Sequence, residues 1–183
     1  SKAGQARRLY ESASIDVPLS ISHDGRRLIV RRDFDLMIMT LDERGEPASP
    51  IQPLFQTPFR EVTAEISPAD KWLAYGSDES GTFEIYVRPF PDVNAGRFQV
   101  SRGGGTQPVW SRDGRELFFF AATGELMGVQ VGTGPAWSAT PPKQIARTGY
   151  LRGNFAAAST YDISPDGKRF LMIKRVETTP ESN

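Results

Sequence analysis

A ten-residue pattern that occurs four times constrains the fold of this chain more than any other feature of its sequence. Each copy has an apolar residue, a serine, a turn pair, a basic residue and then an apolar run. The copies occupy residues 21–30, 66–75, 110–119 and 163–172, and their serines are 45, 44 and 53 residues apart. A chain with this period consists of similar units that stack, because one unit alone cannot bury its apolar faces.

The turn within each copy predicts a tight hairpin. Three copies carry Asp-Gly, where glycine takes a positive φ at little cost and a serine or aspartate side chain can bond to backbone amides. The second copy has Ala69 and Asp70 instead. We expect Asp70 to adopt the conformation of the glycine in the other copies, because aspartate tolerates that conformation better than most residues do.

Short strands are the expected secondary structure throughout. Fourteen prolines and seventeen glycines interrupt the chain, and no window of about 12 residues has a helical period. Strands are expected before the repeated turn at 15–20, 61–66, 107–110 and 160–163, and after it at 27–31, 72–76, 116–121 and 169–174. A third strand is expected at 36–41, 83–88 and 125–131, and a weaker outer one at 51–55, 98–100 and 144–146. The period is close to the roughly 40 to 50 residues of a propeller blade, so the predicted fold is all-β, with β-propeller blades of four antiparallel strands.

The repeat sets the expected boundaries. Blades are predicted at 15–56, 60–101 and 106–147, with a partial blade at 160–176, an N-terminal segment at 1–14 and a tail at 177–183. Two arrangements stay open: a stray outer strand at 7–10 completes the last blade of a small ring, or the chain is a partial propeller completed by dimerisation. An open arc exposes apolar faces, which costs about 25 cal/mol per Å². We therefore favour a homodimer.

Composition excludes several kinds of site. Lysine and arginine number 22, as do aspartate and glutamate, so no basic field favours nucleic acid. The absence of cysteine excludes disulfides and thiolate metal sites, and a single histidine disfavours multi-histidine sites. No apolar run approaches the roughly 18 residues of a membrane span, and the polar start is unlike a signal peptide. We expect no metal, no cofactor and no membrane insertion.

One insertion exceeds what a blade requires. The last interval between serines is the longest, and its extra residues fall in 149–158, between an outer strand and the next inner strand. Connecting loops often carry binding residues on a rigid scaffold. Tyr150, Arg152, Asn154 and Phe155 supply stacking, charge and amide groups there, which predicts a recognition loop.

Further candidates lie where the chain enters an inner strand on the same face: Arg60, Glu61 and Gln107. Their mixed polarity fits a protein or a small polar ligand, and the pattern puts no paired carboxylates, activated serine or imidazole base among them. His23 occupies a turn position where the other copies have proline or arginine, so we expect it to be exposed and structural.

The repeat resembles that of TolB-like propellers, a relative of the WD-type blade, over residues 15–176. The Ser-x-Asp-Gly-Lys/Arg turns, the run 83–90 and the stretch 103–111 carry this resemblance, and together they are similar to the C-terminal propeller of bacterial serine/threonine kinase-like sensor proteins. No kinase signature is present in the chain. The resemblance implies a non-catalytic module for protein interaction or ligand sensing, on the extracytoplasmic side. The alternative is a hydrolase or lyase with a site at the channel mouth, or the accessory propeller of a peptidase.

Overall fold

The computed structural model describes residues 8–147, 149 and 159–174, which form strands and no helix. The first sheet comprises β1 (Asp16–Ile21), β2 (Arg27–Arg32), β3 (Asp35–Thr40) and β4 (Gln52–Pro53). The second comprises β5 (Glu61–Ile66), β6 (Trp72–Ser77), β7 (Glu84–Pro89) and β8 (Phe98–Gln99). The third comprises β9 (Gly105–Trp110), β10 (Glu116–Ala121), β11 (Leu126–Gln130) and β12 (Lys143–Ala146), and β13 (Tyr161–Ile163) pairs with β14 (Phe170–Met172). Since the described residues hold no helix, none of them lies in a helix that could cross a membrane.

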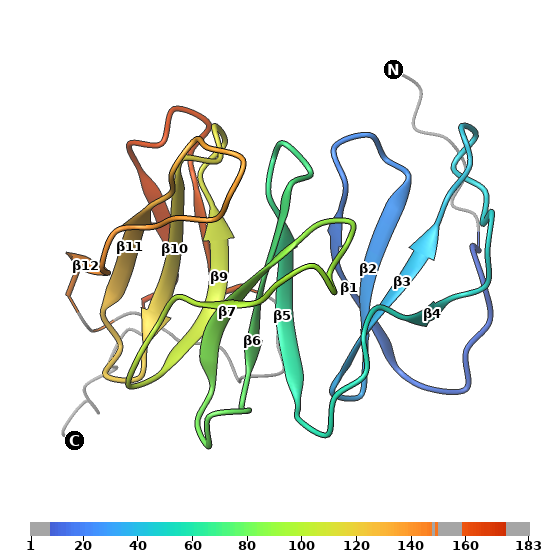
Figure 1. The fold of residues 1–183 in the computed structure, drawn as a ribbon, viewed down its shortest axis with the longest axis horizontal. Helices are drawn as coiled ribbons and strands as arrows, with labels where there is room; N and C mark the ends of the chain where they lie inside the picture. The colour runs from blue at the N-terminus through green and yellow to red at the C-terminus, as the bar shows by residue number, and fades with distance from the viewer. Residues whose placement is uncertain (1–7, 148, 150–158, 175–183) are drawn as a thin grey trace, which may run out of the picture.

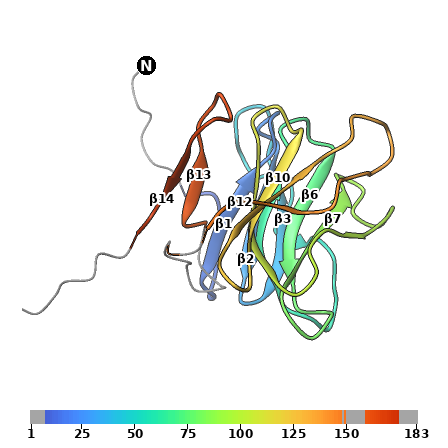
Figure 2. The same cartoon turned by 90° about the vertical axis from the view of Figure 1, so that its left-hand side faces the viewer.

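The sheets are propeller blades arranged in sequence order. Figure 1 shows the three four-stranded sheets side by side, and Figure 2 shows β13 and β14 at one edge of the molecule. Neighbouring strands within each sheet are antiparallel and follow one another in the chain. This confirms the all-β prediction of four-stranded blades.

The ends of the row are not joined by strand pairing. Among the described residues no strand of the first sheet pairs with β13 or β14, so these residues form a partial propeller. Residues 8–15 form no strand, and Tyr10 donates a hydrogen bond from its hydroxyl to the Asp16 carboxylate at 2.8 Å. The expected outer strand at 7–10 is therefore not present in its described part. The homodimer stays a prediction.

The repeated turn has the geometry that its sequence predicts. Gly25 has a φ of 70°, and its amide donates to the Ser22 carbonyl at 2.9 Å. The Ser22 hydroxyl donates to Asp24 at 2.6 Å and accepts from the Arg27 amide at 2.9 Å. The same serine-to-aspartate and amide-to-serine bonds recur in the third and fourth copies, at Ser111 and Ser164. The serine and aspartate therefore satisfy the backbone of the hairpin.

The second turn confirms the expectation for Asp70 and shows what the exception adds. Asp70 has a φ of 54°, close to that of the glycines in the other copies. Its carboxylate accepts the main-chain amide of His23 at 2.8 Å, which lies in the turn of the preceding blade. Glycine could not make this contact. The departure from Asp-Gly thus links two neighbouring blades through their turns.

The core lies between the sheets. One buried cluster joins the first two blades, a second joins the second blade to the third, and a third joins the third blade to β13 and β14. In β6, Leu73 and Tyr75 belong to the first cluster, whereas Ala74 between them belongs to the second. Alternate residues of a strand face opposite sides, so a sheet covered on both faces is apolar throughout.

The strand bounds differ little from those expected, and two of the outer strands are very short. The inner three strands of each blade begin and end within two residues of the predicted positions, whereas β4 and β8 have only two residues each. Outer strands pack on one neighbour and are bordered by water on the other side, so their pairing is less strongly held.

Candidate functional site

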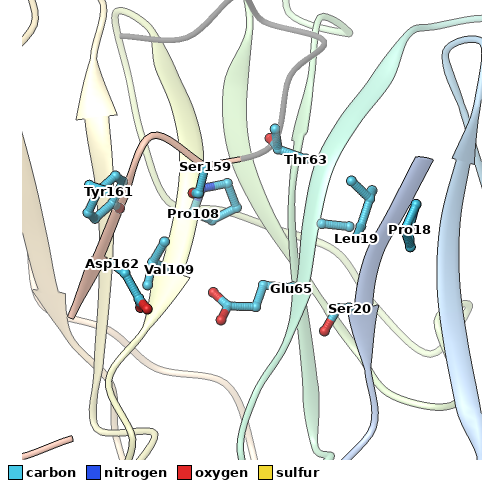
Figure 3. Close-up of a pocket in the computed structure, with 11 residues that line it drawn as sticks. Pro18, Leu19, Ser20, Thr63, Glu65, Pro108, Val109, Ser159, Tyr161 and Asp162 are labelled. Atoms are coloured by element: carbon cyan, nitrogen blue, oxygen red, sulfur yellow. The ribbon is translucent and has the colours of Figure 1, made fainter. Parts of the chain in front are cut away.

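A cavity of about 350 Å³, which we call the channel cavity, opens between the inner strands of the blades. It is lined by residues of all four repeats: Pro18, Leu19, Ser20, Thr63, Ala64, Glu65, Pro108, Val109, Ser159, Tyr161 and Asp162 (Figure 3). Its volume lies within the roughly 300 to 1,000 Å³ typical of small-molecule sites. The cavity is therefore a product of the whole row of blades.

One position of the repeat supplies both carboxylates of the cavity. The residues two places before the repeated serines are Ser20, Glu65, Val109 and Asp162, and all four line the channel cavity. Figure 3 shows Glu65 and Asp162 on different strands, β5 and β13, at the same cavity. The repeat thus brings together two carboxylates that are far apart in the sequence.

Two of these residues also join neighbouring blades. The Ser20 hydroxyl accepts the main-chain amide of Ile66 at 3.1 Å, and Oε2 of Glu65 accepts the amide of Trp110 at 2.8 Å. The indole of Trp110 donates in turn to the Glu65 carbonyl at 3.1 Å. In each pair a polar side chain satisfies an amide at the inner edge of the next blade. Glu65 is therefore held in position by Trp110.

The environment of Glu65 disfavours its charge. Burial raises the pKa of Glu65 to about 7, and the carboxylate of Asp162 acts in the same direction. The amide of Trp110 and the guanidinium of Arg112 oppose the shift. Among the described residues no basic side chain forms an ion pair with either carboxylate, and none lines the cavity. As far as the structure describes its lining, the channel cavity therefore presents carboxylate and hydroxyl oxygens and no cationic side chain.

A second hollow, of about 630 Å³, adjoins the first at the end where the repeated turns lie. The two hollows share Ser20, Glu65 and Asp162, and the second is also lined by His23 and Arg112. His23 is exposed, as its place in the turn predicts. The two carboxylates therefore stand between two open volumes.

Arg60, a predicted site residue, lies outside both hollows. Its guanidinium lies 5.6 Å from the ring centroid of Phe34 and 5.2 Å from that of Phe83, and its Nε donates to Asp78 at 2.7 Å. Phe34 is 43% exposed. Arg60 thus belongs to a surface cluster formed by the first two blades.

Glu61 is buried next to Arg60, so it is not directly available to a ligand in this structure. It is 1% exposed, accepts a hydrogen bond from the Thr57 hydroxyl, and has no partner for Oε2 among the described residues. Burial raises the pKa of Glu61 to about 7, while the bond from Thr57 opposes the shift. Its ligand role stays a prediction.

Gln107 joins the third blade to the partial fourth. It is 1% exposed, and its φ of 56° lies in the left-handed region. The Gln107 side-chain oxygen accepts the Thr160 amide at 2.8 Å, and its carbonyl accepts the Tyr161 hydroxyl at 2.9 Å. These hydrogen bonds link Gln107 to the next repeat, and the residue does not line the channel cavity.

Most of the predicted recognition loop falls in a part of the chain that the structure does not describe. Tyr150, Arg152, Asn154 and Phe155 lie outside the described residues, so their role stays a prediction. Within the described residues no group of three or more histidine, aspartate or glutamate side chains could hold a metal ion.

Sequence reasoning missed Glu65 and Asp162. The only sequence signal for them is their shared place two residues before the repeated serine. That place holds a serine, a glutamate, a valine and an aspartate in the four repeats, so only the stacking of the blades identifies it as facing a cavity. The structure thus supplies a pair of carboxylates where the sequence pattern predicted none.

No family model matches the chain, and no curated protein matches it. Solved structures do. The β-propeller domain of Cps50 (Swd1) from Myceliophteria thermophila has a TM-score of 0.61 at 15% identity, with 92% of this chain and 51% of that chain covered. TolB from Acinetobacter baumannii has a TM-score of 0.51 at 14% identity, with 90% and 44% covered. A puromycin-hydrolyzing peptidase of Mycobacterium tuberculosis has a TM-score of 0.55 at 13% identity, with 92% and 30% covered.

These matches concern the fold. The chain spans about half the length of the first of these structures, and less of the others. The matched proteins include a peptidase and proteins with no enzyme name, so the shared architecture does not separate binding from catalysis. With its antiparallel four-stranded blades and these neighbours, the chain is a partial β-propeller of TolB-like and WD-type architecture.

Proposed function

We propose that this chain is a non-catalytic binding module whose channel cavity receives a cationic group, an ammonium or a guanidinium. The group belongs to a small polar molecule or to a lysine or arginine side chain of a partner protein. The observation that carries the proposal is the lining of the channel cavity, in which Glu65 and Asp162 face one volume that no described basic side chain enters.

The electrostatics favour a cation over other ligands. Two carboxylates in one partly buried cavity repel each other, and a cation between them relieves the repulsion. Glu65 is also preorganised, because the Trp110 amide holds one of its oxygens. Since burial raises the pKa of Glu65 to about 7, a bound cation lowers that pKa and releases a proton when binding occurs below pH 7.

The test uses probes that differ only in charge. N-acetyl-arginine amide and N-acetyl-lysine amide carry the proposed groups, and N-acetyl-citrulline amide is a neutral control of nearly the same shape as the arginine probe. We expect the cationic probes to bind at least about tenfold more tightly than the citrulline probe at pH 8, as measured by ligand-observed NMR. Glu65→Gln and Asp162→Asn are each expected to remove most of that preference.

The control variant is Glu43→Gln, which removes the same charge from a side chain that is 83% exposed on a distant turn. It is expected to leave the preference within about twofold of wild type. Equal binding of the arginine and citrulline probes would reject the proposal, as would equal losses in the Glu65 and Glu43 variants. A peptide that binds while the free amides do not would assign the cation to a partner protein.

An enzyme is the second candidate, a hydrolase or lyase that acts at the channel. The raised pKa of Glu65 favours it, because a carboxylate with a pKa of about 7 suits a general base near neutral pH. An accessory propeller of a peptidase is the related alternative from the sequence. A probe that wild-type protein converts and Glu65→Gln leaves intact would replace the binding proposal with this one.

Location and assembly also belong to the proposal. The TolB-like resemblance supports an extracytoplasmic setting, and the open row of blades supports a homo-oligomer that covers its ends. Light scattering across a dilution series tests the second point.

A further inference from the structure

A groove on the outer side of the molecule, separate from the channel cavity, lies between the second and third blades. Its volume is about 880 Å³. One wall is the outer strand β8 with the residues around it, and the other is the excursion 137–142 between β11 and β12. We call it the outer groove and define it by Arg97, Phe98, Arg102, Trp137 and Pro141, which line it.

The apolar part of the outer groove is an aromatic cluster. Trp137 stacks on Phe98 with ring centroids 6.1 Å apart, and it also contacts Trp72 at 5.2 Å and Trp110 at 6.2 Å. The excursion that carries Trp137 is fixed to the third blade, since the Gly132 amide donates to the Ser138 carbonyl at 2.8 Å. The groove wall is therefore held in place by both blades.

The polar groups of the outer groove are donors. The Arg102 side chain is exposed and has no ion-pair or hydrogen-bond partner among the described residues. The indole N–H of Trp137 likewise donates no hydrogen bond to a described residue. Arg97 forms an ion pair with Glu79, which lies outside the groove lining. No described carboxylate lines the groove. The charge of the outer groove is thus positive.

The strand at its wall has an unused edge. β8 is the end strand of its sheet and pairs only with β7 among the described residues. The outer side of such a strand presents backbone groups that an extended segment can pair with. The outer groove thus combines three features: an aromatic cluster, guanidinium and indole donors, and the open edge of a strand.

We propose that the outer groove binds an extended acidic peptide segment of a partner protein. A carboxylate side chain of the peptide meets Arg102, and an apolar neighbour packs on Phe98 and Trp137. Arginine and tryptophan are enriched among the few residues that carry most of the binding energy of protein interfaces. The excess of positive charge selects an acidic peptide over a neutral or basic one.

A displayed library of random twelve-residue peptides, selected in parallel against wild-type protein and two variants, tests this site. Arg102→Glu reverses the groove charge, and Arg44→Glu makes the same change on an exposed turn of the first blade. We expect wild type and Arg44→Glu to enrich peptides with aspartate or glutamate beside an aromatic residue or proline. Arg102→Glu is expected to lose that enrichment.

The best peptide is then synthesised with its Gln/Asn analogue and measured by fluorescence polarisation. We expect the analogue to bind at least about tenfold more weakly than the acidic form, and Arg102→Glu to weaken the acidic form by a similar factor. Trp137→Phe keeps an aromatic ring and removes the indole donor, and we expect a loss of about threefold to tenfold. A selection without enrichment, an enriched set that is basic or neutral, or equal losses in the Arg102 and Arg44 variants would overturn the proposal.

Discussion

The channel cavity presents two carboxylates, Glu65 and Asp162, whereas the outer groove presents two guanidinium groups, Arg97 and Arg102. The first is formed by inner strands, at equivalent positions of the repeat, and the second by the outer strand of one blade and the excursion before the outer strand of the next. The regular part of the repeat therefore builds a site from all blades at once. The irregular part builds a site that belongs to one pair of blades.

Trp110 connects the two regions. Its amide and indole hold Glu65 at the channel cavity, and its ring contacts Trp137 of the outer groove at 6.2 Å. It is 3% exposed and belongs to the cluster between the second and third blades. A substitution at Trp110 is therefore expected to affect both sites.

The largest effect is expected from Trp110→Ala. Removing this buried ring leaves a cavity between two blades and should lower the free energy of unfolding by about 3–5 kcal/mol. Chemical denaturation measures the loss, and binding of both the cationic probes and the selected acidic peptide should weaken together. A stability loss below about 1 kcal/mol would contradict the packing role of Trp110. Weakened binding at only one site would show that the two regions are not coupled through this residue.

A smaller effect of opposite sign is expected from Glu65→Gln. Because burial raises the pKa of Glu65 from 4.5 to about 7, the folded state holds this proton more tightly than the unfolded state does. Wild-type stability from this group is present below pH 4.5 and is lost as pH rises to about 7. The neutral amide keeps an acceptor for Trp110, so the variant should exceed wild type by about 1–3 kcal/mol at pH 8 and by nothing at pH 4.

Denaturation curves of both proteins at pH 4, 6 and 8 measure this difference. Glu43→Gln is the control, because its exposed side chain has no burial cost to remove. A gain for Glu65→Gln that is the same at all three values of pH would contradict the role assigned to its charge.

The smallest effect concerns salt. Arg102 is exposed, whereas Glu65 is partly buried, so added ions screen the outer groove more than the channel cavity. Raising NaCl from 0.05 to 0.5 M should weaken the acidic peptide by about threefold or more and the arginine probe by less than about twofold. Titrations at the two salt concentrations decide this, and equal salt dependence would remove the distinction between the sites.

Local sequence predicted much of the fold. The Asp-Gly pairs and the repeated serines specify a hairpin through contacts within about six residues, so the turns and the strands beside them were found from the sequence. Asp70 was also anticipated, because its conformation depends on its own backbone. Its bond to His23 was not, since that amide belongs to another blade.

The candidate sites were less predictable. Glu61 and Gln107 were chosen for their polarity near an inner strand, yet both are 1% exposed, and Gln107 binds the next repeat. Glu65 was not chosen, because the sequence around a glutamate in a strand does not show whether its side chain faces solvent or a cavity.

The amino-acid sequence by itself determined the number of repeats, the turns and the strands, because those follow from spacing and from contacts between near neighbours. Only the tertiary structure decided that Glu65 meets Asp162 at one cavity and that Trp137 packs on Phe98. Those meetings depend on how each sheet is stacked on the next. The stacking brings together residues of different repeats, and no local pattern records which of them will be in contact.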